Sequence, residues 1–89
     1  MFSGTKLITK NDELYLKQGE SEHKVLKGWE SMNGWYWFAT ELNNDGLHFG
    51  YVQGTYPEWG HFHQEELKSI PTVWEIPQEN LAISGRMDD

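Results

Sequence analysis

The sequence predicts an α+β domain in which an antiparallel sheet of four to five strands is built on a central aromatic hairpin. A short N-terminal helix and a short helix after the third core strand complete the predicted fold. Two observations support it. Aromatic and β-branched residues flank an Asn/Asp-rich bend between residues 35 and 53, as in a β-hairpin. Polar runs before and after that region resemble helix starts. Residues 1–83 are expected to form this single domain, and residues 84–89 a flexible tail.

Residues 10–18 are expected to form the N-terminal helix, after a frayed start at residues 1–8. The Thr9 hydroxyl can accept an early backbone N–H, and acidic residues follow in the first turn, where the positive end of the helix dipole favours them. Gly19 suits the helix end. Leu14 is then the residue expected to face the core most directly.

The strongest strand signal lies in residues 35–42, which are aromatic and β-branched and contain no Gly or Pro. The bend at residues 43–46 tolerates left-handed backbone angles, so residues 47–53 are expected to return as the second strand of the hairpin. The other expected elements are a strand at 23–29, a short strand at 59–62, one or two helical turns at 63–68 held by Leu67, and a last strand at 72–76.

The two faces of the predicted hairpin differ in kind. One face is continuously large and apolar, and Phe38 and Phe49 on it are expected to lie against the N-terminal helix or another layer as core. The other face places Gly50 beside Trp37. Either a groove walled by indoles forms there, or the missing side chain lets Trp37 lie flat on the sheet.

Charge and composition exclude several function classes. The chain of 89 residues has 14 acidic against 7 basic residues and a formal net charge of −7, so it lacks the attraction to phosphate backbones that nucleic-acid binding requires. It contains no Cys and no run near the ~20 apolar residues of a membrane span. We therefore expect a cytoplasmic protein that binds neither nucleic acid nor membranes. The acidity either keeps an aromatic-rich protein soluble or attracts a basic partner.

Metal and cofactor chemistry finds little support in the pattern, and no cofactor is expected. His61 and His63 stand two residues apart on a predicted strand, so both rings would point to one side, with Glu58 near enough in sequence to join them. Two His and a carboxylate would suit zinc. The more ordinary interpretation is that both are surface histidines.

Catalysis is not expected either. Glu41 and His48 are predicted to lie near each other across the hairpin, but acid/base catalysis would also need a pocket that shifts their pKa values. A structural hydrogen bond is the simpler role for Glu41. The Gly residues fall singly at turns and strands, so no phosphate-binding loop is present in the sequence.

Protein recognition remains as the predicted function, because Trp and Tyr are enriched in interface hot spots and loops expose such rings. For Trp59, packing in the core is an equally open alternative. The predicted partner-binding residues are Trp35, Trp37, Glu41, Tyr56, Glu58 and Trp59.

A Trp-x-x-Thr-Glu-Leu run at residues 37–42, then Phe-Gly at 49–50 and Pro-Glu-x-Gly-x-Phe-x-x-x-Glu-Leu at 57–67, together with residues 23–27 upstream, resemble a family of small uncharacterised proteins. That family recurs on bacterial plasmids, integrative elements and phages. The resemblance implies a compact α+β domain of a mobile element, and the family has no established site residues to transfer. The chain departs from the pattern at His61, His63 and Gln64.

The sequence therefore predicts a small acidic, non-enzymatic interaction module of a phage or other mobile element, which binds or inhibits a host protein. A basic host protein is the expected kind of partner. The alternative is a small metal- or ligand-binding domain that uses His61, His63 and Glu58.

Overall fold

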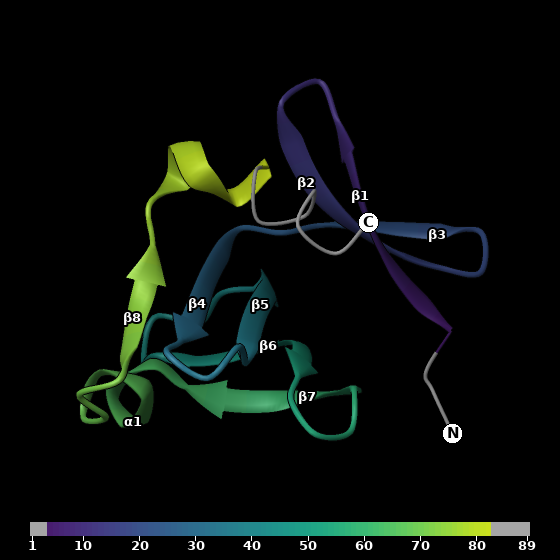
Figure 1. The fold of residues 1–89 in the computed structure, drawn as a ribbon. Coiled ribbons are helices and arrows are strands. Elements are labelled where there is room, and N and C mark those ends of the chain that lie inside the picture. The colour runs from purple at the N-terminus through teal and green to yellow at the C-terminus, as the bar shows by residue number, and fades with distance from the viewer. Residues whose placement is uncertain (1–3, 83–89) are drawn as a thin grey trace.

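The computed structural model describes residues 4–82 and contains two antiparallel β-sheets, shown in Figure 1. A three-stranded sheet has the order β1-β2-β3, and a five-stranded sheet has the order β7-β6-β5-β4-β8. The α+β prediction is therefore wrong, because the chain is mostly β and its helical segments are short. The elements are β1 (Thr5–Lys10), β2 (Glu13–Gln18), β3 (Ser21–Lys24), β4 (Lys27–Ser31), β5 (Tyr36–Glu41), β6 (Leu47–Gln53), β7 (Glu58–His63), α1 (Gln64–Lys68), β8 (Val73–Ile76) and the 3-10 turn η1 (Gln78–Asn80).

The three-stranded sheet, which we call the small sheet, stands where the N-terminal helix was predicted. Asn11 and Asp12 have φ angles of 54° and 61° and form a two-residue turn between β1 and β2. Gly19, with a φ of 60°, begins the equally tight turn into β3. Leu14 and Leu16 are both buried, and this two-residue period is that of a strand. The expected frayed start is also wrong from residue 5 onwards, because β1 pairs along its whole length with β2.

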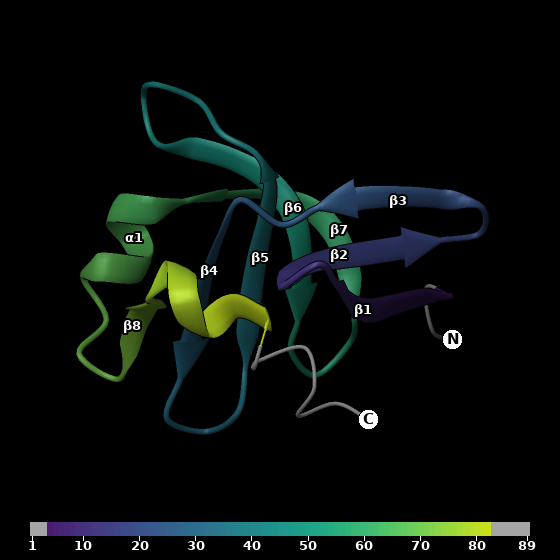
Figure 2. The same cartoon turned by 90° about the horizontal axis from the view of Figure 1, so that it is seen from above.

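The strand predicted at residues 23–29 is divided, because the chain changes sheets in its middle. The N–H of Val25 donates to the carbonyl of Leu14 in the small sheet, at 2.9 Å. The N–H of the next residue, Leu26, donates to the carbonyl of Ala39 in the five-stranded sheet, at 2.8 Å. The link between β3 and β4 in Figure 2 is this crossing.

The central hairpin is confirmed as β5 and β6, which pair from Tyr36 opposite Gln53 to Ala39 opposite Gly50. A β-bulge follows, in which Thr40 is the extra residue and Glu41 lies opposite Phe49. The predicted elements after the hairpin are also confirmed, as β7, α1 and β8, and Leu67 is the buried residue of α1.

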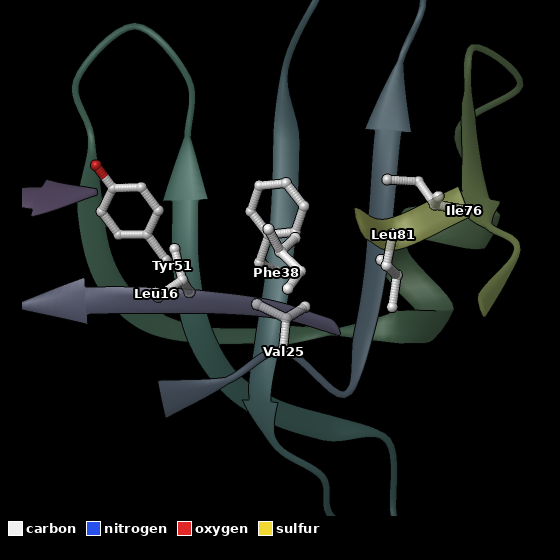
Figure 3. Close-up of a cluster of buried hydrophobic side chains, with 7 residues drawn as sticks. Leu16, Val25, Phe38, Tyr51, Ile76 and Leu81 are labelled. Atoms are coloured by element: carbon white, nitrogen blue, oxygen red, sulfur yellow. The ribbon is translucent and has the colours of Figure 1, made fainter. Parts of the chain in front are cut away.

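The main core lies between the two sheets. Phe38 and Tyr51 on the five-stranded sheet face Leu16 and Val25 of the small sheet region, and Figure 3 shows β2 crossing the strands behind it at a steep angle. Leu81, after η1, closes the same core. The predicted apolar face of the hairpin thus packs at Phe38 and Tyr51 against a second sheet instead of a helix. The prediction that Phe49 lies in this core is wrong, because its side chain is only partly buried and lines an open pocket.

A second buried cluster lies on the opposite face of the five-stranded sheet. It consists of Trp29, Ala39 and Leu67, with Trp37 and Phe62 packed against it, so α1 covers this face. The central strands are therefore buried on both faces, which explains why residues 35–42 have aromatic residues at consecutive positions.

The space beside Gly50 is filled by backbone, which neither of the two alternatives predicted. A Cβ added there would lie 1.9 Å from the carbonyl oxygen of Phe38 and 2.8 Å from the Cα of Ala39. The backbone of β5 at the bulge occupies this space, and Gly50 is needed because the two strands approach so closely.

Candidate functional site

A pocket of about 260 Å³ opens to solvent at the junction of the two sheets. We call it the intersheet pocket. The inner face of the small sheet supplies two of its lining residues, and β5, β6 and β7 supply the others. The lining residues are Gln18, His23, Thr40, Glu41, Phe49 and Trp59.

Within residues 4–82, Glu41 is the only carboxylate that lines the pocket, and the bulge in β5 places it there. In a regular hairpin Glu41 would share a face with Trp37 and Ala39, because side chains alternate along a strand. Thr40 is the extra residue, so Glu41 lies opposite Phe49 and lines the pocket instead. The Thr40 hydroxyl donates to the carbonyl of Phe49 at 3.4 Å, across the bulge.

An aromatic wall lines the same pocket as Glu41. The rings of Phe49 and Trp59 are stacked, with centroids 6.0 Å apart and planes inclined by 20°. The ring of His23 approaches Trp59 edge-on at 5.4 Å. The indole N–H of Trp59 donates to the Thr5 hydroxyl at 3.0 Å, which holds the ring in place from the small sheet. Trp59 therefore both packs against the core and lines the pocket.

Within residues 4–82, no Lys or Arg lines the intersheet pocket. Lys17 and Lys24 are sequence neighbours of Gln18 and His23, but strand alternation directs them to the outer face of the small sheet. There Lys24 forms an ion pair with Glu13, and its hydrogen bond is the main cause that lowers the pKa of the Glu13 carboxyl below its ordinary value.

The structure brings two of the predicted partner-binding residues, Glu41 and Trp59, into one site and places the others elsewhere. Trp35 and Trp37 lie together on the opposite face of the five-stranded sheet, with their ring centroids 6.0 Å apart. Glu58 belongs to the same face as Trp37, because both pair with Val52.

Tyr56 lies in the loop between β6 and β7. With 76% of its surface exposed, its side chain is almost entirely in solvent. Among the four aromatic residues of the predicted set it is the most exposed.

The candidate metal ligands do not converge. His61 and His63 lie on one face of β7, and strand alternation places Glu58 on the other. The Nδ1 of His63 accepts the backbone N–H of Glu65 at 3.2 Å and so caps α1. Within the part of the chain that the structure describes, no group of three or more His, Cys, Asp and Glu side chains could hold a metal ion.

His48 has a structural position that the sequence did not reveal. It is 3% exposed, and its Nδ1 accepts the backbone N–H of Asn43 at 3.2 Å. Its Nε2 therefore carries the proton and donates to the side-chain oxygen of Gln64 at 2.9 Å. The prediction that Glu41 lies near His48 is wrong, because the bulge moves Glu41 to the other face of the sheet.

Sequence reasoning missed four residues of the pocket, namely Gln18, His23, Thr40 and Phe49. For Gln18 a signal existed, because it continues the alternation of Leu14 and Leu16 onto the inner face of β2. For Thr40 and Phe49, which lie at the bulge, the sequence contains no comparable signal.

Comparison with protein-family models, with curated proteins and with solved structures found no match. The resemblance to proteins of mobile elements therefore stays a prediction. None of the helices in residues 4–82 is long and apolar enough to cross a membrane.

Proposed function

We propose that this protein is a small acidic, non-enzymatic interaction module that binds a basic partner protein. A phage or other mobile element would encode it to bind or inhibit a protein of the bacterial host, as the family resemblance suggests. The observation that supports binding to a basic partner is the unequal distribution of charge between the two sheets.

Charge divides along the chain at the crossing between the sheets. Residues 26–82 contain eight acidic residues and two basic ones, Lys27 and Lys68. Four lysines lie on the small sheet, and two of them, Lys10 and Lys24, are paired with carboxylates. The five-stranded sheet and its loops therefore form an acidic side, which favours encounter with a positively charged surface.

Exposed aromatic residues lie on this acidic side. Tyr56, Trp35 and Trp74 all belong to residues 26–82 and are exposed. Rings of this kind contribute much of the binding free energy of protein interfaces, whereas exposed charges mainly raise the association rate. The combination fits a surface that attracts a basic protein and then holds it by aromatic contacts.

Affinity capture from a bacterial host lysate tests the proposal. We expect the immobilised protein to retain a basic protein whose recovery falls as salt rises, because salt screens the charge attraction. Tyr56→Ala should reduce the recovery about tenfold or more, as for an interface hot spot.

Met32→Ala is the matched control, because Met32 is 74% exposed and Tyr56 is 76% exposed. Recovery should stay at the wild-type level in this variant. Retention of no basic protein, or equal recovery by the Tyr56→Ala variant and the wild type, would contradict the proposal.

A further inference from the structure

The lining of the intersheet pocket combines two features that recognise a cation. Phe49 and Trp59 provide aromatic rings, whose electron-rich faces attract positive charge. Glu41 provides a carboxylate beside them. In residues 4–82 no Lys or Arg side chain lines the pocket to neutralise that carboxylate. Among the residues that the structure describes, the pocket thus offers a carboxylate with no basic partner in its lining, next to an aromatic wall.

We propose that this pocket receives an arginine side chain of the partner, with its guanidinium paired to Glu41 and lying against Phe49 and Trp59. The proposal rests on the function proposed above and names the group that the basic partner contributes.

Arginine fits the lining better than lysine does. Its planar guanidinium stacks on rings and carries five N–H donors in a fixed fork. Three residues of the pocket lining carry groups that can accept hydrogen bonds, namely the Glu41 carboxylate, the Gln18 amide oxygen and the Thr40 hydroxyl. The ammonium of lysine is a compact, strongly hydrated charge and would use this set less completely.

The structure holds the recognising groups before a ligand arrives. The bulge fixes the position of Glu41 on the strand. The hydrogen bond from the indole of Trp59 to Thr5 fixes that ring. Groups that are already ordered lose little conformational entropy on binding, so a single side chain can bind measurably.

The test is an NMR titration of the full chain with arginine blocked at both termini, which follows the indole N–H resonance of Trp59. Blocked citrulline is the matched ligand, because it has nearly the same shape but no charge. We expect arginine to shift the Trp59 resonance with a dissociation constant of about millimolar size, citrulline to cause no saturable shift, and blocked lysine to bind several-fold more weakly than arginine.

Glu41→Gln is the test variant, since it removes the charge and keeps the size of the side chain. It should weaken arginine binding at least about fivefold. Glu66→Gln is its control, because Glu66 is an exposed carboxylate on α1, which covers the other face of the five-stranded sheet, and this variant should bind arginine like the wild type.

Three results would overturn the proposal: an unshifted Trp59 resonance, equal binding of citrulline or lysine, or unchanged binding by Glu41→Gln. Capture of a basic partner equally by Glu41→Gln and the wild type would overturn the pocket assignment and leave the proposed function standing. Selective arginine binding without capture of any basic protein would overturn the proposed function and leave the pocket assignment standing.

Discussion

At Gly50 a single missing side chain allows the bulge to form. The positions that a Cβ would contact belong to the backbone of β5, so they cannot move aside as a flexible side chain would. Gly50→Ala should therefore lower the free energy of unfolding by about 3 kcal/mol or more, since overpacking against fixed atoms is costly. Chemical denaturation of the variant and the wild type measures the difference.

Gly60 provides the control, because it pairs directly with Gly50 and a Cβ there would meet no atom within 4 Å. Gly60→Ala should change the free energy of unfolding by less than about 1 kcal/mol. Equal effects of the two substitutions would contradict the close approach at the bulge.

His48 is the second residue whose role depends on its neighbours. His48→Phe keeps a ring of similar size stacked on Trp29 but leaves Asn43 and Gln64 without their hydrogen-bond partner. We expect a loss of about 1–3 kcal/mol of stability in thermal or chemical unfolding. His61→Phe, at an exposed position, should cost little, and a similar loss in both variants would speak against the buried hydrogen bonds.

The role of His48 could not be predicted from the sequence. One partner, Asn43, lies in the bend before β6, and the other, Gln64, is the first residue of α1. Neither contact produces a recognisable pattern in the sequence. The hydrophobic character of Leu67, in contrast, was enough to predict that it anchors α1.

At the scale of elements, the hairpin of β5 and β6 was predictable because aromatic strands and a turn-forming bend agree there. Residues 10–18 were wrongly predicted to form a helix because the residue types that favour a helix start also favour a tight turn between strands. Asn and Asp are favoured at helix starts and also in left-handed turns, and the second use is the one found at Asn11 and Asp12. The alternation of Leu14 and Leu16 was the deciding signal.

The turn between β1 and β2 yields an element-scale prediction. Asp12 has a φ of 61°, a conformation that favours Gly. Asp12→Gly should thus raise the free energy of unfolding by about 0.5–1 kcal/mol, measured by chemical denaturation. A helix in this region would instead be weakened by the substitution.

Asp45→Gly is the matched substitution in the central hairpin, between β5 and β6. Asp45 accepts the backbone N–H of Leu47 at 3.1 Å and has no left-handed φ to relieve. This variant should be destabilised, so the two substitutions are expected to have opposite signs. A destabilising effect of Asp12→Gly would contradict the turn.

The ion pairs on the outer face of the small sheet predict a pH effect. Hydrogen bonds from Lys10 to Glu22 and from Lys24 to Glu13 are the main causes that hold the pKa of each carboxyl below its ordinary value. Such groups stabilise the fold above their unfolded pKa, and this stabilisation is lost as the pH falls through the folded pKa. Because the pairs are exposed, the effect should be small and screened by salt.

An NMR titration of the Glu side chains measures both pKa values directly. Lys10→Met should raise the pKa of Glu22 and leave that of Glu13 unchanged, since Lys10 is not among the groups that lower the latter. A rise in both would show that the two pairs are not separate.

At the scale of the whole molecule, the sequence predicted two members of the candidate site but not the site. Glu41 and Trp59 were chosen as an acidic and an aromatic surface residue. They line one pocket because the bulge moves the Glu41 side chain to the other face of the sheet. The small sheet supplies two further lining residues, one from β2 and one from β3. Both causes are tertiary, since the packing of one sheet on another decides them.

The same packing explains how a chain with little apolar content forms a pocket and still folds. The small sheet covers one face of the five-stranded sheet and α1 covers the other, so the central aromatic residues are buried on both sides. The pocket lies where the inner face of the small sheet meets β5, β6 and β7. Binding of the partner's arginine side chain is thus proposed at the boundary between the layers.

The most direct measurement is an isotope-filtered NOE experiment on the protein saturated with blocked arginine. We predict NOEs between the side-chain methylene protons of arginine and the ring protons of Phe49 and Trp59. NOEs to the exposed rings of Trp35 or Trp74 in their place would contradict arginine recognition at the intersheet pocket.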